Sequence, residues 1–299
     1  MINFKNNDNH DANKNDPQVR HITIGVGQLD PRLLEILPPE IRQMIEKDME
    51  DLGRTTASEE ESVKRDKIKF DYKMVNCNQD LKELTEKLKK SEHKDYGILL
   101  YGCSGAGKSY YAEWLAQELG MPFIKKRSSD LIERWVGSTE KNIRNAFKEA
   151  REKKAILVLD EADSFLFDRK FAKQDFQAGH VNEVLTQMED HPYPFVMTTN
   201  LKEKLDPAAM RRFIFKIKYK PMAPKNINAG VSTYFGKEFK LTDEQVVELD
   251  GLCAGDFKVA KKKCQILDGG IFTNELVFKY LKKELDEKNI VKPSNPINV

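Results

Sequence analysis

Short apolar runs alternate with helical patterns along residues 68–221. The runs have the length of strands and lie at 97–101, 122–127, 155–159, 194–198 and 213–219. Two of them, ILLY and AILVL, are continuously apolar, which is typical of strands that are buried on both faces of a parallel sheet. We therefore expect an α/β domain over residues 68–221, with a five-stranded parallel sheet and helices on both of its faces.

The strand pattern stops after Pro221, and only helical patterns follow it. They cover residues 224–236, 242–251, 256–267 and 273–287. Asp256 follows Gly255, and we expect it to cap the third of these helices. The pattern predicts a small all-helical domain over residues 222–290, followed by a frayed tail over residues 291–299.

Residues 1–67 contain little that could form a core of their own. Residues 1–20 are rich in Asn, Asp and Lys, and we expect them to be disordered. Residues 31–52 have an amphipathic helical pattern, and this helix must pack on the body of the protein, on a neighbouring subunit or on a partner. Residues 54–66 are polar and charged, which indicates a linker or a loosely held surface helix.

Composition and charge indicate the cellular compartment of the protein more clearly than they indicate its function. The 299 residues carry a formal net charge of +2, so no overall charge favours nucleic acid or a membrane surface. No apolar run approaches the length of a membrane span, and the polar N-terminus lacks an apolar signal segment. The four cysteines show no C-x-x-C spacing, which argues against a zinc site and a disulfide framework and predicts a reducing cytoplasm.

A glycine-rich turn follows the first apolar run and matches the phosphate-binding P-loop, G-x-x-x-x-G-K-S. Its residues are Gly102, Cys103, Ser104, Gly105, Ala106, Gly107, Lys108 and Ser109. The glycines allow successive backbone N–H groups to converge on one anion, and the following helix directs its positive end the same way. Lys108 is expected to reach the β- and γ-phosphates of ATP, and the Ser109 hydroxyl is expected to ligate Mg²⁺. Oxidation of Cys103 could block the loop as a side effect, although an ordinary small residue is the simpler interpretation.

The apolar run AILVL leads directly into two carboxylates, Asp160 and Glu161, at the edge of the sheet where ligands of parallel sheets bind. Asp160 is expected to hold Mg²⁺ through water. Glu161 is expected to orient and polarise the water that attacks the γ-phosphate. The alternative is that the two residues only cap a helix.

These two motifs, in this order and about fifty residues apart, resemble those of the AAA+ ATPases. The resemblance implies that Asn200, at the end of PFVMTTN, contacts the attacking water or the γ-phosphate. It also implies that Arg211 and Arg212 are arginine fingers that reach the nucleotide of the adjacent subunit, in a ring that is usually hexameric. Solvated surface arginines are the alternative.

The segment ERWVGSTEKNIRNAF contains Trp135, Val136 and Gly137 between two helical patterns, and Ser138 or Thr139 is expected to cap the second helix. The three residues match the family's pore loop, which grips an extended polypeptide in the central channel of the ring. An exposed Trp on a mobile loop would otherwise need an explanation, and the alternative is a Trp packed into the core.

The resemblance covers residues 68–290 and is nearest to the branch that holds spastin and katanin, and to little-described single-module bacterial members. Two adjacent arginines precede Phe213, and Gly255 to Phe257 form a Gly-Asp-Phe element like that of the bacterial members. The chain departs from the family at Cys103 and Ala106, where proline and threonine are common. It also has no arginine at a sensor-2 position near residues 256–261.

The sequence predicts an ATP-hydrolysing motor that remodels, unfolds or disassembles a protein substrate, with the helical domain as a lid over the base and ribose. Two alternatives stay open. One is a motor or loader directed to nucleic acid, which the Trp-Val-Gly loop and the near-neutral charge disfavour. The other is an ATP-gated scaffold of low turnover that recruits a partner through the helix at 31–52.

Overall fold

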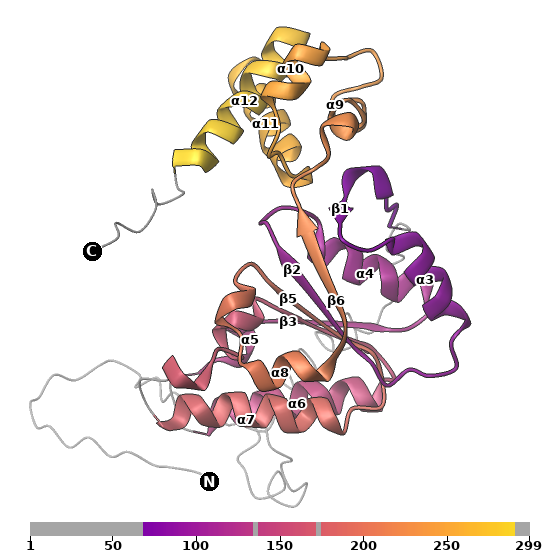
Figure 1. Ribbon diagram of the computed structural model, residues 1–299, viewed down its shortest axis with the longest axis vertical. Helices are drawn as coiled ribbons and strands as arrows, with labels where there is room; N and C mark the ends of the chain where they lie inside the picture. The colour runs from indigo at the N-terminus through magenta and orange to yellow at the C-terminus, as the bar shows by residue number, and fades with distance from the viewer. Residues whose placement is uncertain (1–67, 134–136, 172–174, 291–299) are drawn as a thin grey trace, which may run out of the picture. The chain divides into compact units, whose positions relative to one another are not determined.

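The computed structural model describes residues 68–133, 137–171 and 175–290 (Figure 1). The predicted N-terminal tail, the amphipathic helix at 31–52, the linker and the C-terminal tail lie outside the described residues. Trp135 and Val136 lie outside them as well. None of the helices described combines the length and the apolar character that a membrane span requires.

A six-stranded sheet forms the centre of residues 68–221. Its order is β1-β6-β2-β5-β4-β3, and the strands are β1 (Asn76–Cys77), β2 (Gly97–Gly102), β3 (Phe123–Arg127), β4 (Ile156–Asp160), β5 (Phe195–Thr199) and β6 (Phe213–Lys220). Strands β2 to β6 pair in parallel, and they confirm the five predicted strands, each of which begins within one residue of its expected position. The two-residue β1 pairs antiparallel with β6, and the hydrophobic pattern does not predict it.

Helices cover both faces of this sheet, as the continuously apolar strands require (Figure 1). Alternate strand residues supply the two cores, because successive side chains of a strand point to opposite faces. Leu99 and Leu157 pack with α5 (Ser128–Leu131), α6 (Ser138–Glu152), α7 (Asp175–Glu189) and α8 (Pro207–Arg212). Ile98 and Val158 pack on the other face with α3 (Leu81–Lys90) and α4 (Lys108–Glu118). The α/β class is therefore confirmed.

Residues 222–290 contain no strand and form a third hydrophobic core. The helices are α9 (Ile227–Tyr234), α10 (Asp243–Glu248), α11 (Ala254–Leu267) and α12 (Asn274–Ile290). Phe257, Leu281 and Val277 are fully buried in this core. The exact domain boundary at residue 221 stays a prediction.

The expected helix caps are wrong at two positions. Asp256 lies inside α11, whose N-cap is Cys253, and the Asp256 carboxylate accepts a hydrogen bond of 2.6 Å from the Cys253 N–H. Gly137, rather than Ser138 or Thr139, is the N-cap of α6, and the Thr139 hydroxyl accepts from the Glu133 N–H at 3.0 Å. In both cases the polar side chain satisfies a backbone group near the helix start from a position other than the cap.

The helical region, residues 222–290, contacts residues 68–221 at the glycine-rich turn. The Gly255 N–H, at the start of α11, donates to the Gly105 carbonyl at 2.8 Å. A Cβ atom at Gly255 would lie 3.1 Å from the Gly105 Cα, which is closer than most Cβ contacts. The two backbones can approach this closely because residue 255 is glycine, whereas a Cβ atom at Gly105 would lie 3.5 Å from the Gly255 Cα, an ordinary van der Waals distance.

Candidate functional site

The glycine-rich turn joins β2 to α4 in a conformation that requires its glycines. Gly102, Gly105 and Gly107 have φ values of +124°, +71° and +89°. Side chains other than glycine rarely adopt these angles. Gly107 is the N-cap of α4, so the helix begins at Lys108, and its free N–H groups face the space beside the turn. This turn and helix start form the anion cradle that the P-loop spacing predicts.

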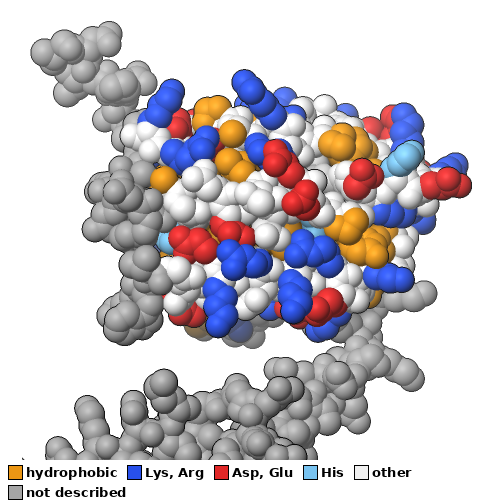
Figure 2. Space-filling view, turned by 90° about the horizontal axis from the view of Figure 1, so that it is seen from below, with side chains coloured by type: hydrophobic (Ala, Val, Ile, Leu, Met, Phe, Trp, Pro, Cys, Tyr) orange, Lys and Arg blue, Asp and Glu red, His pale blue; other side chains and the backbone are white. Residues whose placement is uncertain are grey.

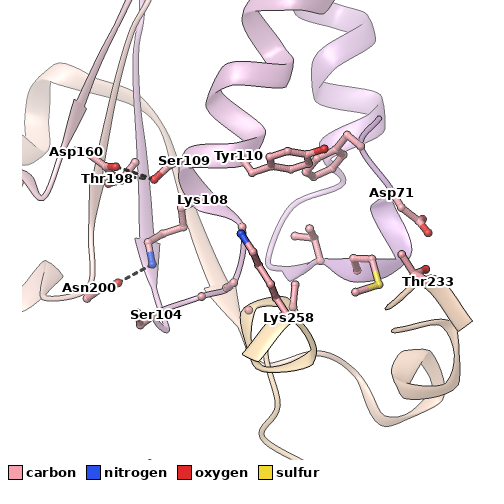
Figure 3. A pocket seen from close by; sticks show the side chains of 18 of the residues that line it. Asp71, Ser104, Lys108, Ser109, Tyr110, Asp160, Thr198, Asn200, Thr233 and Lys258 are labelled. Atoms are coloured by element: carbon pink, nitrogen blue, oxygen red, sulfur yellow. Dashed lines mark hydrogen bonds between the residues drawn. The ribbon is translucent and has the colours of Figure 1, made fainter. Parts of the chain in front are cut away.

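Lys108 and Asn200 lie together at this cradle. The Lys108 Nζ donates to the carbonyls of Gly102 and Cys103 at 3.0 and 2.8 Å and to Asn200 Oδ1 at 2.7 Å (Figure 3). Burial lowers the pKa of the Lys108 ammonium. Asn200, which directly follows β5, therefore lies within hydrogen-bond distance of the P-loop lysine.

Asp160 accepts hydrogen bonds from three elements at the end of β4. Ser109 Oγ lies 2.8 and 3.0 Å from the two carboxylate oxygens, Lys125 Nζ of β3 lies 2.9 Å from Oδ2, and the Thr198 hydroxyl of β5 donates to Oδ1. Burial alone would raise the pKa of Asp160, but the donors Thr198, Lys125 and Ser109 outweigh it and hold the pKa below its usual value. The carboxylate is therefore ionised at neutral pH and lies beside the hydroxyl predicted to share a cation with it.

Glu161 is the next residue, and its backbone is strained. Its φ and ψ are 60° and 47°, in the left-handed region that few residues with a Cβ occupy. The side chain is exposed, and its Oε2 accepts a hydrogen bond of 3.0 Å from Ser128 Oγ, at the start of α5. Strained residues of this kind are concentrated at functional sites.

A cavity of about 670 Å³ opens beside the turn, a size typical of small-molecule sites. Residues of the turn line it together with Asp160 and Asn200 (Figure 3). Glu161 lines it as well. Met74, Val75, Tyr110 and Tyr234 supply apolar and aromatic surface, and Lys258 of α11 adds a cation. The cavity therefore combines an anion cradle with an apolar region large enough for a nucleotide base.

Three polar residues of this site are not identified by any motif in the sequence. Lys125 and Thr198 contact Asp160, and Lys258 lines the cavity. Lys125 leaves one signal, because it is a cation within a strand whose neighbour β4 is apolar throughout most of its length. Lys258 lies in the segment 256–261, where the family pattern would place an arginine.

Arg211 and Arg212 end α8 and do not line the cavity. Arg212 forms an ion pair with Glu189 and donates to the Ala208 carbonyl at 2.9 Å. Arg211 is exposed, and no residue in the described part of the chain forms an ion pair or hydrogen bond with its guanidinium. Of the predicted pore loop, the structure describes only Gly137, which has a φ of +85° and is the N-cap of α6.

Comparison with known families agrees with this geometry. Residues 98–221 match the model of the ATPase family associated with various cellular activities (AAA). The match begins in β2 and ends just after β6, so it contains the glycine-rich turn, both carboxylates, Asn200 and the paired arginines.

The chain is also similar to individual proteins over about half of its length. It is 34% identical over 163 residues to the protein ORF529 of Acidianus two-tailed virus, covering 50% of this chain and 31% of that protein. It is 34% identical over 176 residues to the vacuolar protein sorting-associated protein 4B of Mus musculus, covering 54% of this chain and 39% of that protein. For the vacuolar protein sorting-associated protein 4A of Homo sapiens the identity is 35% over 162 residues, covering 51% of this chain and 37% of that protein. The chain thus spans between three and four tenths of the length of these relatives.

Proposed function

We propose, from the match of residues 98–221 to the family of ATPases associated with various cellular activities, that the chain is a member of this family and that it binds and hydrolyses ATP. One observation carries the proposal. Lys108, Ser109, Asp160 and Asn200 come from separate parts of the sequence and meet at the carboxyl ends of three parallel strands, through contacts of 2.7 to 3.0 Å. This is the edge of a parallel sheet at which ligands bind.

The residues of the turn fit a triphosphate. The backbone N–H groups of residues 104–109 and the ammonium of Lys108 would hold its oxygens, and Tyr110, Tyr234 and Val75 would border the base and ribose. Lys108 now donates to two carbonyls and to Asn200, so binding would exchange at least one of these hydrogen bonds for a phosphate oxygen.

The oxygens at Asp160 also fit a magnesium ion. A carboxylate and a hydroxyl within 2.8 Å of each other are the hard oxygen ligands that Mg²⁺ prefers, and Ser109 and Asp160 would hold it. When bound, Mg²⁺ supplies positive charge against the phosphate oxygens. We assign to Glu161 the orientation and deprotonation of the attacking water, because it is the exposed carboxylate next to Asp160.

The proposed substrate is a protein, and the proposed assembly is a ring, in the form of a hexamer. The family resemblance of Trp135, Val136 and Gly137 to a polypeptide-gripping loop supports the substrate class. Arg211 supports the assembly, because its guanidinium is exposed and has no hydrogen-bond or ion-pair partner among the described residues. The chain would then work in the cytoplasm as a motor that remodels, unfolds or disassembles its substrate.

The charge distribution favours protein over nucleic acid as the substrate. On the described surface that faces the viewer in Figure 2, basic and acidic side chains alternate and form no continuous basic patch. Near α6 and α7, basic side chains form ion pairs with acidic ones, such as Arg144 with Glu183 and Lys153 with Glu149. A nucleic-acid motor would instead need clustered cations along the phosphate backbone.

Steady-state ATP hydrolysis tests the proposal. We expect Glu161→Gln to keep nucleotide affinity and to lose roughly 100- to 10,000-fold in turnover. Glu203→Gln is the matched control, because Glu203 is an exposed carboxylate on η4 (Lys202–Lys204) outside the cavity. Near-normal turnover in Glu161→Gln would remove Glu161 from the proposed role.

Two further measurements separate the alternatives. Turnover per subunit that rises with protein concentration supports sites shared between subunits, whereas a scaffold of low turnover would show little hydrolysis at any concentration. Stimulation by an unfolded polypeptide supports a protein motor, and stimulation by DNA or RNA alone would favour the nucleic-acid alternative.

A further inference from the structure

Two thiols from distant parts of the sequence meet beside the cavity. Cys103 of the glycine-rich turn and Cys253, the N-cap of α11, have their Sγ atoms 3.2 Å apart, although 150 residues separate them. Among the described cysteines the other two are placed differently. The Cys77 thiol donates to the Gln79 carbonyl, and Cys264 is buried on α11.

The backbone around the two thiols holds them at this distance. The Gly255 N–H donates to the Gly105 carbonyl at 2.8 Å, two residues beyond each cysteine. The Cys253 N–H is fixed in turn by the Asp256 carboxylate. A disulfide requires an Sγ–Sγ distance of about 2.05 Å, so the sulfurs need to approach by only about 1 Å.

The two thiols differ in accessibility and in acidity. Cys103 is partly exposed, whereas Cys253 is buried. The hydrogen bond from Cys253, followed by the charge of Lys108, lowers the pKa of Cys103 to about 7. The same contact and burial raise the pKa of Cys253. Cys103 is therefore the thiolate that reacts first with a reagent from solvent, and Cys253 is placed to resolve the product.

We propose that Cys103 and Cys253 form a reversible disulfide with each other, through thiol–disulfide exchange with a low-molecular-weight disulfide such as oxidised glutathione, and that this bond weakens nucleotide binding. The Cys103 thiolate attacks one glutathione sulfur, which forms a mixed disulfide and releases one glutathione thiolate. Cys253 then loses its proton to solvent and attacks the Cys103 sulfur, which releases the second glutathione thiolate. Two protein thiols are oxidised, and one glutathione disulfide is reduced to two glutathione molecules.

The bond would connect two walls of the cavity. Ser104 and Gly105 follow Cys103, Ala254 and Gly255 follow Cys253, and all four line the cavity. The Cys103 carbonyl also accepts from Lys108 Nζ at 2.8 Å, so a displacement of Cys103 changes the position of the lysine. Formation of the disulfide does not depend on the proposed ATPase function, but its effect on nucleotide affinity rests on that function.

Because of thermodynamic linkage, the effect can be measured both as a change in nucleotide affinity and as a change in the midpoint potential of the disulfide. If the oxidised chain binds nucleotide tenfold more weakly, saturating nucleotide must favour the reduced chain by the same factor. For a two-electron couple this tenfold factor shifts the midpoint potential by about 30 mV toward easier reduction.

The experiment uses the full chain in glutathione buffers of graded redox ratio. Peptide mapping under non-reducing conditions is expected to find a peptide that links Cys103 to Cys253, with loss of two of the four thiols. Binding of a fluorescent ADP analogue is expected to weaken at least tenfold in the oxidised chain and to recover after dithiothreitol. The same titration with saturating ADP should shift the midpoint by about 30 mV or more.

Serine variants provide the controls. Cys253→Ser should form no linked peptide and should instead retain glutathione on Cys103 as a mixed disulfide, which peptide mapping detects by its mass. Cys264→Ser is the matched control, because Cys264 is also buried at α11 but is not in the pair, and it should respond as the parent does. No linked peptide in the parent at any ratio, or a linked peptide with unchanged nucleotide affinity, would overturn the proposal. Failure of the reduced parent to bind nucleotide would contradict the proposed function, whereas the linked peptide would still show whether the thiols form an oxidation site.

Discussion

At the scale of single residues, the carboxylate of Asp160 is the most closely surrounded charge of the site. Ser109 and Lys125 contact it at 2.8 and 2.9 Å, and the Thr198 hydroxyl donates to it as well. The Lys125 ammonium lies against Oδ2, one of the two oxygens that a divalent cation would use. Any such cation would therefore share the carboxylate with a positive charge that the protein itself supplies.

Lys125→Met is expected to lower the Mg²⁺ concentration needed for nucleotide retention by about tenfold. The physical reason is the loss of repulsion between the ammonium and the divalent ion, and a tenfold change corresponds to about 1.4 kcal/mol of this repulsion. The measurement is a Mg²⁺ titration of fluorescent ADP binding at constant ionic strength. Lys126→Met is the control, because Lys126 on the same strand pairs with Glu149 at 3.0 Å. Equal Mg²⁺ requirements in both variants would contradict this account of Lys125.

The motifs predict part of this residue-scale arrangement. Lys108, Ser109 and Asp160 can be found from spacing, because their chemistry requires fixed separations along one strand and one turn. Lys125 and Thr198 cannot, because their contact with Asp160 depends on the register of β3 and β5 beside β4. That register is set by the packing of the whole sheet.

At the scale of secondary-structure elements, the turn from β2 to α4 depends on Gly102. Its φ is +124°, and a Cβ atom there would overlap the carbonyl oxygen of Tyr219 on the neighbouring β6. We expect Gly102→Ala to lower the free energy of unfolding by about 3 kcal/mol, because backbone strain and overlap add. Gly120→Ala is the control, since Gly120 has φ +63° but no atom within 4 Å of the added methyl group, and it should cost only about 1 kcal/mol. Urea denaturation measures both, and equal losses would show that the contact with β6 contributes nothing.

His191 makes the connection from α7 to β5 sensitive to pH. The imidazole is buried against the Phe147 ring at a centroid distance of 5.2 Å, and neither ring nitrogen has a hydrogen-bond partner in the part of the chain that the structure describes. Burial, with a smaller contribution from the charge of Arg151, lowers its pKa to about 4. Because the unfolded chain has a histidine pKa of about 6.5, it binds the proton first as the pH falls, and stability is lost between about pH 6.5 and 4.

His191→Phe is expected to remove this contribution, which amounts to at most about 3 kcal/mol. Chemical denaturation at several pH values between 4 and 7 measures it, and the variant should lose less stability than the parent over this interval. The same substitution at exposed His93 is the control and should leave the pH profile of the parent unchanged. A parallel profile for His191→Phe and the parent would rule out His191 as the source.

Periodicity predicts the elements better than it predicts their ends. Each of the five parallel strands begins within one residue of its expected position, because a strand buried on both faces leaves a continuous apolar run. The caps of α6 and α11 were expected at Thr139 or Ser138 and at Asp256, and the structure places Gly137 and Cys253 there. Asp256 and Thr139 have the side chains of caps, but Asp256 accepts from the cap residue three positions before it, and Thr139 accepts from Glu133, six positions before it.

At the scale of the whole molecule, the paired arginines have different surroundings. Arg211→Ala is expected to lower turnover about a thousandfold or more, because an arginine supplied to the active site of a neighbour stabilises the charge of the transferring phosphoryl group. Its free energy of unfolding should stay within about 0.5 kcal/mol of the parent, because Arg211 is exposed. Steady-state hydrolysis and urea denaturation of the same preparation measure the two effects.

Arg212→Ala tests whether the second arginine has a structural role instead. It removes the ion pair with Glu189 and the hydrogen bond to Ala208, so we expect a loss of about 1 kcal/mol in stability. Glu189→Gln is the matched control, since it breaks the ion pair and leaves Arg212 in place. Full activity in Arg211→Ala would show that sites are not completed by this residue.

At this scale, the sequence and the structure of a single chain predict less than they do for residues and elements, because assembly involves a second molecule. The roles of Arg211 and of the Trp135 loop depend on a second molecule, and no property of an isolated chain identifies a surface that becomes buried on assembly. The apolar pattern of the strands, by contrast, reports burial inside the chain. For this reason the α/β fold follows from the pattern, whereas the ring and its protein substrate remain proposals.

The left-handed backbone of Glu161, at φ 60°, has a consequence for the evolution of this protein. A residue with a Cβ in this conformation costs about 1 kcal/mol or more, which glycine would not incur. Heat tolerance and catalysis therefore make opposite demands on one position. A lineage selected only for survival at high temperature would gain by placing glycine at residue 161, and it would give up the carboxylate assigned to water activation in the same mutation.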